Sequence, residues 1–194
     1  ELFNKTAEEV CEGQQLDMNF ETQDQVSLPL YLKMIRFKTA VLLACSLKIG
    51  ALVANASAED QENLYHFGIY IGIAFQLMDD ILDVYGEQKD FGKQIAGDIL
   101  SNKKTCLYII AYEKANKYQR KVLDHYFSHQ NFEPKNKVLE VMKVYDAIGV
   151  KSLCLEMMAQ NHALAIRYLN AVSVSEERKS VLFKFIDILM LREN

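Results

Sequence analysis

Apolar side chains recur at steps of three and four residues along nearly the whole sequence, which is the period of amphipathic helices. The pattern predicts helices over residues 1–21, 29–56, 57–86, 105–115, 117–127, 134–148, 150–172 and 175–192. No segment has the alternation typical of a strand, and 194 residues include only two prolines and eight glycines. We therefore predict an all-α fold in which residues 1–194 form a single domain.

Local signals mark the ends of some of these helices. Ser57 with Asp60 resembles a capping box at the start of the third helix. Gly86 is expected to end that helix in the left-handed conformation that glycine tolerates. Ser173 with Glu176 resembles another capping box before the last helix.

The third predicted helix is apolar on nearly every side, so we expect it to be buried. Near its end it carries four polar side chains that share one sector of the helix: Gln76, Asp79, Asp80 and Asp83. Carboxylates inside a buried helix cost several kcal/mol unless they are neutralised. The negative end of the helix dipole adds to that cost. We therefore expect a cation to bind there.

Lysines lie where they could serve the same ligand. The apolar stripe of the second predicted helix consists of Tyr31, Ile35, Leu42, Cys45 and Ile49. Lys38 lies on this stripe, where it either extends its ammonium group to solvent or serves an anionic site. The polar stretch after the third helix adds Lys93, Lys103 and Lys104. Carboxylates can hold Mg²⁺ that is shared with substrate phosphates, so the pattern predicts a diphosphate or triphosphate site.

Composition narrows the function further. The net charge of −4 and the lack of a basic stripe argue against a nucleic-acid surface. No apolar run is long enough to form a transmembrane segment. The four cysteines occur singly within apolar patterns, which favours buried free thiols in a reducing compartment, and we predict a cytoplasmic protein. Neither a glycine-rich phosphate loop nor a zinc-type cluster is present.

Several short motifs, in their order along the chain, resemble the trans-isoprenyl diphosphate synthases, also called polyprenyl synthetases. The matching segments are Gly13-Gln14 with Asp17, Lys38-Thr39-Ala40, FQLMDDILDVYG at 75–86, Gly92-Lys93, Gly97-Asp98-Ile99 and Asn102-Lys103. The resemblance covers about residue 8 to Lys103, and the helices beyond carry no diagnostic motif. Several linked motifs in the right order are more specific than the DDxxD alone.

The resemblance implies an all-α bundle around a central cavity and a homodimer. It also implies a Mg²⁺-dependent prenyltransferase of isoprenoid biosynthesis that joins an allylic diphosphate to isopentenyl diphosphate. Asp79 would ligate Mg²⁺ most directly, with Asp80 and Asp83 as direct or indirect partners. The allylic diphosphate would be bound by Lys38 and Lys103, with Lys93 close by.

The resemblance assigns further side chains to the reacting groups. Gln76 and Thr39 would line the reacting centre, where a carbonyl and a hydroxyl can stabilise positive charge or help to accept a proton. Phe75 would border the isopentenyl pocket. Gln14 and Asp17 would face the cavity from the first helix.

One family feature has no counterpart in this sequence. The family carries a first aspartate-rich region followed by paired arginines, whereas residues 79–83 are the only DDxxD here. We therefore interpret the chain as the C-terminal portion of a longer synthase that lacks the N-terminal helices, and expect it to be inactive alone. The alternatives are a non-catalytic partner subunit, a terpene cyclase, or a helical scaffold whose acidic helix end binds no ligand. The cyclase fits less well because its second metal motif normally mixes Asp or Asn, Ser or Thr, and Glu.

Overall fold

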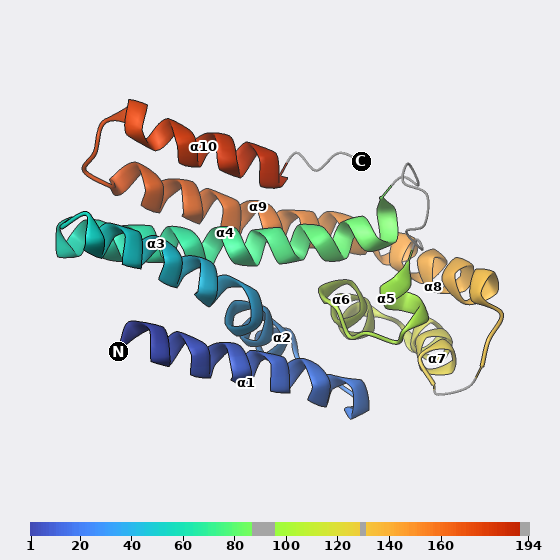
Figure 1. Cartoon of the computed structure of the whole chain (residues 1–194). Helices are drawn as coiled ribbons and strands as arrows, with labels where there is room; N and C mark the ends of the chain where they lie inside the picture. The colour runs from blue at the N-terminus through green and yellow to red at the C-terminus, as the bar shows by residue number, and fades with distance from the viewer. Residues whose placement is uncertain (87–95, 129–130, 191–194) are drawn as a thin grey trace.

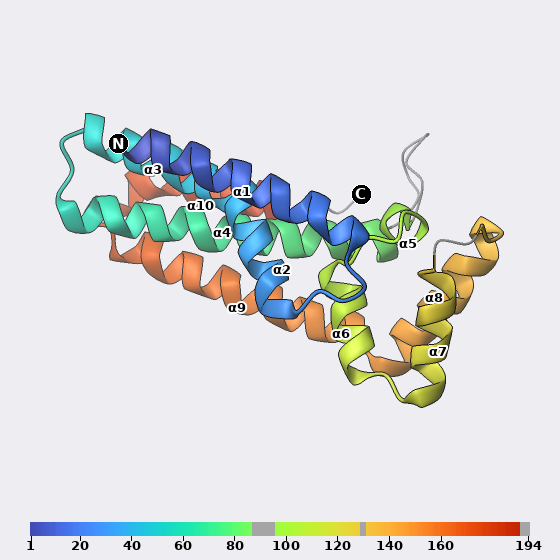
Figure 2. The ribbon, with the colours of Figure 1, turned by 90° about the horizontal axis from the view of Figure 1, so that it is seen from below.

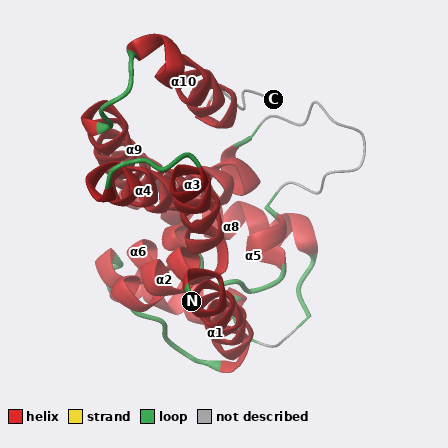
Figure 3. Ribbon diagram, turned by 60° about the vertical axis from the view of Figure 1, so that its left-hand side comes forward, coloured by secondary structure: helices red, strands yellow, loops and turns green. Residues whose placement is uncertain are grey.

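The computed structural model describes residues 1–86, 96–128 and 131–190, and every regular element among them is a helix (Figure 3). In chain order the elements are α1 (Leu2–Thr22), α2 (Leu28–Ile35), the π-helical segment η1 (Arg36–Ala40), α3 (Val41–Val53), α4 (Ala58–Tyr85), α5 (Gly97–Leu100), α6 (Cys106–Lys114), α7 (Lys117–Tyr126), α8 (Pro134–Ile148), α9 (Val150–Ala171) and α10 (Glu176–Met190). The all-α prediction is confirmed.

The long helix α4 lies at the centre of the molecule (Figure 1). Helices α3 and α9 run along it, α10 also contacts it, and α5 and α6 lie near its C-terminal end. Helix α1 packs on η1 and α3, on the opposite side of the molecule from α10 (Figures 1 and 2). The side chains of Phe67, Ile71 and Leu77 are fully buried, which confirms the prediction that the middle of this helix is enclosed.

The predicted helix over residues 29–56 contains a wider turn at η1. A π-turn takes up one more residue than an α-turn, so an apolar stripe extrapolated at a constant period loses its register beyond it. The structure buries Val41 and Ala44, whereas Leu42 and Ile49 of the predicted stripe are exposed. The stripe prediction was therefore wrong at these two positions.

Two glycines let other helices approach η1 closely from two sides. A Cβ at Gly13 of α1 would lie 2.4 Å from the Lys38 backbone nitrogen. A Cβ at Gly72 of α4 would lie 2.7 Å from Cα of Ala40. Because real Cβ contacts are never this short, any larger residue would push the helices apart. The segment that carries Lys38 and Thr39 is thus held between α1 and α4.

The left-handed conformation predicted for Gly86 is not found. Gly86 is extended, with φ −67° and ψ 154°, and its amide still donates to the carbonyl of Leu82. The chain therefore leaves α4 without the reversal that a left-handed glycine makes. Among residues 1–86, 96–128 and 131–190, the glycine with a left-handed conformation is Gly149, with φ 77°, at the junction of α8 and α9.

One of the two predicted capping boxes is wrong and the other is partly confirmed. The side chain of Ser57 accepts a hydrogen bond from the amide of Asp60 at the start of α4. The Asp60 carboxylate also accepts from the amide and hydroxyl of Ser173. Ser173 therefore links the start of α10 to α4 instead of capping α10, which begins at Glu176.

None of the helices in the described part of the chain is long and apolar enough to cross a membrane.

Candidate functional site

Asp80 is the most buried carboxylate of the predicted site, with 4% of its surface exposed. One oxygen, Oδ2, accepts from the Tyr31 hydroxyl and, at 3.3 Å, from the Cys106 backbone amide. Burial raises its pKa from 3.8 to about 6, against the opposing effect of hydrogen bonds from Tyr31, Gln76 and Cys106. Three protein donors thus satisfy a carboxylate that would otherwise be costly to bury.

Gln76 extends these contacts toward η1. Its Nε2 donates to Oδ1 of Asp80 at 3.3 Å, and its Oε1 accepts from the Thr39 hydroxyl at 3.2 Å. An ionised carboxylate only accepts, so Asp80 holds the amide nitrogen of Gln76 and leaves the carbonyl oxygen for Thr39. We call Tyr31, Asp80, Gln76 and Thr39 the inner hydrogen-bond chain. It joins α2, α4 and η1.

Asp83 belongs to a different cluster, one turn further along α4. Its Oδ2 accepts from the Asp98 amide at 2.9 Å, and its carbonyl accepts from the Ala96 amide at 2.7 Å. The carboxylate of Asp98 pairs with Nζ of Lys103 at 2.7 Å, which raises the pKa of Lys103. We call Asp83, Asp98 and Lys103 the outer charged turn. The short helix α5, which the sequence did not predict, builds it.

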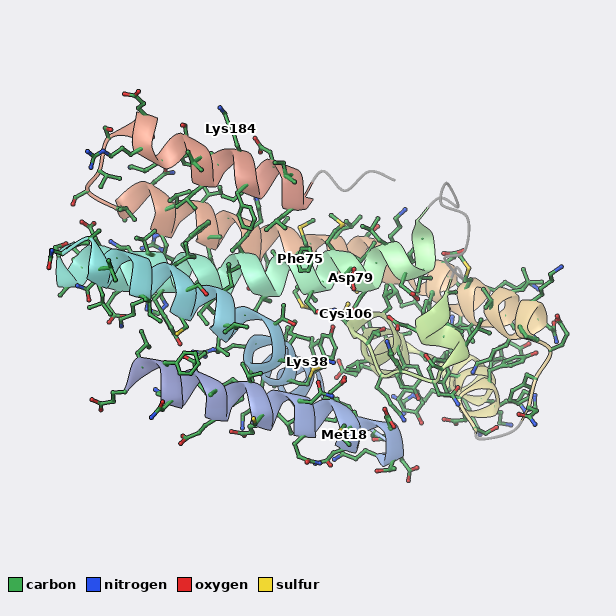
Figure 4. All side chains as sticks on the ribbon, viewed as in Figure 1. Met18, Lys38, Phe75, Asp79, Cys106 and Lys184 are labelled. Carbon is green, nitrogen blue, oxygen red and sulfur yellow. The ribbon has the colours of Figure 1, made fainter. Side chains whose placement is uncertain are left out.

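Lys38 belongs to η1, and its side chain extends to α1 (Figure 4). Its Nζ pairs with Oδ2 of Asp17 at 2.6 Å, and 38% of its side chain is exposed. Gln14, one turn before Asp17 on α1, is exposed. The structure therefore joins the predicted lysine to the predicted aspartate, and it places that lysine at the edge of the core. Both sequence interpretations of Lys38, solvent exposure and an anionic site, fit this position.

Asp79 differs from the other two carboxylates because it is exposed (Figure 4). The expectation that all three would be buried in one sector was wrong, since α4 turns Asp80 inward and Asp83 toward α5. Phe75, one turn before Asp79 on α4, is half-buried. The carboxylates have different environments because adjacent helical residues point about 100° apart.

Asp79 and Asp83 have the donor chemistry that Mg²⁺ prefers. They are one helical turn apart, and the pKa of Asp83 is raised by burial and by the charges of Asp98 and Asp79. A cation beside them would relieve that repulsion. No group of three metal-ligating side chains converges within residues 1–86, 96–128 and 131–190.

The structure places the other predicted lysines in different positions. Lys103 lies in the outer charged turn, as described above. Lys104 contacts α1, where its Nζ donates to the Glu21 carbonyl at 3.3 Å. Lys93 lies outside the described residues.

Sequence reasoning treated Tyr31 as an ordinary core residue and gave Cys106 no role at the site. A buried tyrosine hydroxyl needs a hydrogen-bond partner, so a tyrosine on an apolar stripe was a signal that a polar group faced it. No comparable signal was available for Cys106, because it contributes its backbone amide. The cysteine prediction is confirmed for Cys45, Cys106 and Cys154, which are buried and free, and it is wrong for Cys11, which is exposed.

Comparison with known proteins identifies the family. The family model described as Polyprenyl synthetase matches residues 1–148, so the match extends beyond the motif-bearing region on both sides. The chain belongs to the polyprenyl synthetase family, the trans-isoprenyl diphosphate synthases.

Individual relatives agree with this family. A geranylgeranyl diphosphate synthase from Saccharolobus solfataricus is 33% identical over 187 residues, which are 95% of this chain and 55% of that protein. A crystal structure of a geranylgeranyl pyrophosphate synthase has a TM-score of 0.90 at 39% identity, over 100% of this chain and 60% of that one. The structure of the Corynebacterium glutamicum enzyme, complexed with isoprenyl diphosphate and magnesium, has a TM-score of 0.87 at 28% identity, over 98% of this chain and 54% of that one.

The chain spans about half the length of the curated relatives it matches.

Proposed function

We propose that the protein is a Mg²⁺-dependent trans-prenyltransferase that joins an allylic diphosphate to isopentenyl diphosphate in isoprenoid biosynthesis. The carrying observation is that the end of α4 brings carboxylates next to a lysine from another element. Asp79 is exposed, and Asp83, one turn later, accepts from the amide of Asp98, whose carboxylate pairs with Lys103. Carboxylates beside an ammonium group form a site for a metal-bound diphosphate.

Lys38 and Lys103 are proposed to bind the diphosphate of the allylic substrate. Each ammonium has a carboxylate partner, Asp17 or Asp98, and both ion pairs are partly exposed. Partly exposed ion pairs are weak, so phosphate oxygens with more charge can replace the carboxylates at little cost. The same two lysines would then stabilise the charge that grows on the diphosphate as its bond to the allylic carbon breaks.

Asp79 and Asp83 are proposed to hold Mg²⁺, which when bound neutralises part of the charge on the leaving diphosphate. Asp80 is proposed to act through Gln76, because its oxygens already accept three protein donors. The inner hydrogen-bond chain fixes the Gln76 carbonyl and the Thr39 hydroxyl. Oxygen atoms held there can stabilise the allylic cation that the double bond of isopentenyl diphosphate attacks.

The remaining roles are also proposals. Phe75 would border the isopentenyl group, and Gln14 with Asp17 would face the substrate from α1. The central cavity and the homodimer remain expectations from the family. The 194 residues alone are expected to be inactive, because they contain a single DDxxD.

Product analysis tests the proposal. The protein encoded by the full gene is incubated with dimethylallyl and isopentenyl diphosphates, with Mg²⁺ or with a chelator. A linear prenyl diphosphate longer by one or more isopentenyl units, formed only with the metal, is the expected product. Tight Mg²⁺-dependent binding of the allylic diphosphate without any condensation would instead favour a non-catalytic subunit. A cyclic hydrocarbon would favour a terpene cyclase.

A further inference from the structure

Lys137 is a buried lysine in the part of the chain where the sequence shows no diagnostic motif. It lies in the first turns of α8, with 5% of its surface exposed. Its Nζ is 5.4 Å from the centre of the Phe127 ring. An ammonium group is rarely buried this far unless its donors have specific partners.

The two hydrogen-bond partners of Lys137 are the last residue of α5 and a residue of the turn that follows it. Nζ donates to the Leu100 carbonyl at 3.2 Å and to Oδ1 of Asn102. These acceptors are neutral, and burial lowers the pKa of Lys137. Carbonyl groups at a helix C-terminus carry partial negative charge and favour a cation, which helps to offset the cost of burial. The lysine therefore anchors α5 to α8.

The anchored residue Asn102 directly precedes Lys103. Asn102 has φ 57°, a left-handed conformation that reverses the chain at this point. Beyond it, the Lys103 amide donates to the Asp98 carbonyl at 2.9 Å, and its Nζ pairs with the Asp98 carboxylate. The segment from Asp98 to Lys103 is thus attached to α4 at Asp98, through Asp83, and to α8 at Leu100 and Asn102, through Lys137.

We propose that Lys137 is a positioning residue for diphosphate binding, which holds the turn at Leu100–Asn102 so that Lys103 presents its ammonium group to the ligand. This inference rests on the proposed function. Without the anchor, the turn must be ordered each time ligand binds, and that ordering weakens affinity. Lys137 itself contacts the turn and not the ligand.

The test compares Lys137→Met with Lys143→Met in the protein encoded by the full gene. Methionine keeps most of the apolar side chain and removes the donors. Lys143 lies on the same helix, pairs with Glu140, and has 60% of its side chain exposed. Calorimetric titration with inorganic diphosphate in excess Mg²⁺ should show about tenfold weaker binding for Lys137→Met and unchanged binding for Lys143→Met. Equal affinity for wild type and Lys137→Met would overturn the inference.

A double-mutant cycle with Lys103→Met distinguishes positioning from general destabilisation. If Lys137 acts through Lys103, then adding Lys137→Met to Lys103→Met costs no further affinity. A further tenfold loss on that background would overturn the inference. If Lys137→Met does not fold, Asn102→Gly tests the contact from the other side, since it removes the acceptor and keeps the left-handed backbone. The same cycle with Lys103→Met then applies.

The wild-type titration separates the two proposals. If the wild-type protein does not bind diphosphate with Mg²⁺, the proposed function fails and this inference fails with it. If wild type binds and Lys137→Met binds equally well, only the role of Lys137 fails.

Discussion

Asp79 and Asp80 are neighbours in the sequence, yet they lie in opposite environments. Asp80 is buried within the inner hydrogen-bond chain, where Tyr31, Gln76 and the Cys106 amide donate to it. Asp79 is exposed, one helical turn before Asp83 of the outer charged turn. The Asp80 carboxylate is bound by fixed protein donors, whereas the Asp79 carboxylate is accessible to a ligand from solution.

The two environments suggest different roles for the same chemical group. The inner hydrogen-bond chain uses buried bonds that are strong in a low dielectric and expensive to break. The outer charged turn uses partly exposed ion pairs, which contribute little to stability and exchange easily. Changes in the inner chain should therefore affect stability first, and changes on the exposed side should affect ligand binding and turnover.

Asp79→Ala gives the largest expected effect. In the protein encoded by the full gene we expect kcat to fall by about a thousandfold, because alanine cannot replace the carboxylate that we propose as a Mg²⁺ ligand. Stability should change by less than about 0.5 kcal/mol, since surface substitutions away from special features are usually neutral. Steady-state kinetics and urea unfolding of the same preparations measure both. Asp187→Ala, an exposed aspartate on α10, is the control for a lost surface charge. Normal turnover by Asp79→Ala would remove this residue from the site.

Asp80→Asn tests the opposite environment through the pH dependence of stability. Folding raises the pKa of Asp80 from 3.8 to about 6. A raised acid pKa contributes stability that is fully present below the unfolded value and is lost as pH rises through the folded value. The shift corresponds to about 3 kcal/mol, which wild type loses between about pH 4 and pH 6.

Asparagine does not ionise, so the variant should not lose this contribution. Urea unfolding at several pH values in the presence of a chelator measures the free energy of unfolding for both proteins. The stability of Asp80→Asn relative to wild type should rise across that pH window. Parallel curves for the two proteins would show that Asp80 is not the titrating group.

Tyr31→Phe removes one donor from the inner hydrogen-bond chain and leaves the ring in place. We expect a loss of about 2 kcal/mol in the free energy of unfolding at neutral pH, because a buried charged acceptor loses a partner. Without this donor the pKa of Asp80 should rise further. Tyr118→Phe, at a tyrosine that is 75% exposed, is the control and should not change stability. An unchanged free energy of unfolding for Tyr31→Phe would mean that the hydroxyl does not hold Asp80.

Much of the fold was predictable because helical periodicity and the signals for helix ends depend on residues that are close together in the sequence. The predicted bounds of α8, Pro134–Ile148, match the structure because Pro134 and Gly149 mark both ends. The family was predictable from the order of its motifs. Periodicity could not predict the π-turn at η1. This segment packs on α1 and α4, and the sequence around residues 36–40 carries no signal of those contacts.

The environments of the carboxylates were not predictable from spacing. Asp79 and Asp80 are both polar residues on one helix, and their partners lie far away in the sequence. Tyr31 is 49 residues from Asp80, and Lys137 is 35 residues from Asn102. Only tertiary packing decides which carboxylate is enclosed and which lysine holds the turn before Lys103.

Lys38→Met is expected to have only a small effect on stability, and Lys33→Met provides a matched control. Both lysines pair at 2.6 Å with an α1 carboxylate 21 residues earlier, Glu12 for Lys33 and Asp17 for Lys38. Each substitution should lower the free energy of unfolding by less than about 1 kcal/mol, because both pairs are partly exposed. Only Lys38→Met should weaken Mg²⁺-dependent diphosphate binding, measured by the same calorimetric titration. Equal diphosphate binding by both variants would show that Lys38 forms a surface ion pair and does not bind the ligand. If Lys38→Met does not fold, the role of Lys38 is structural.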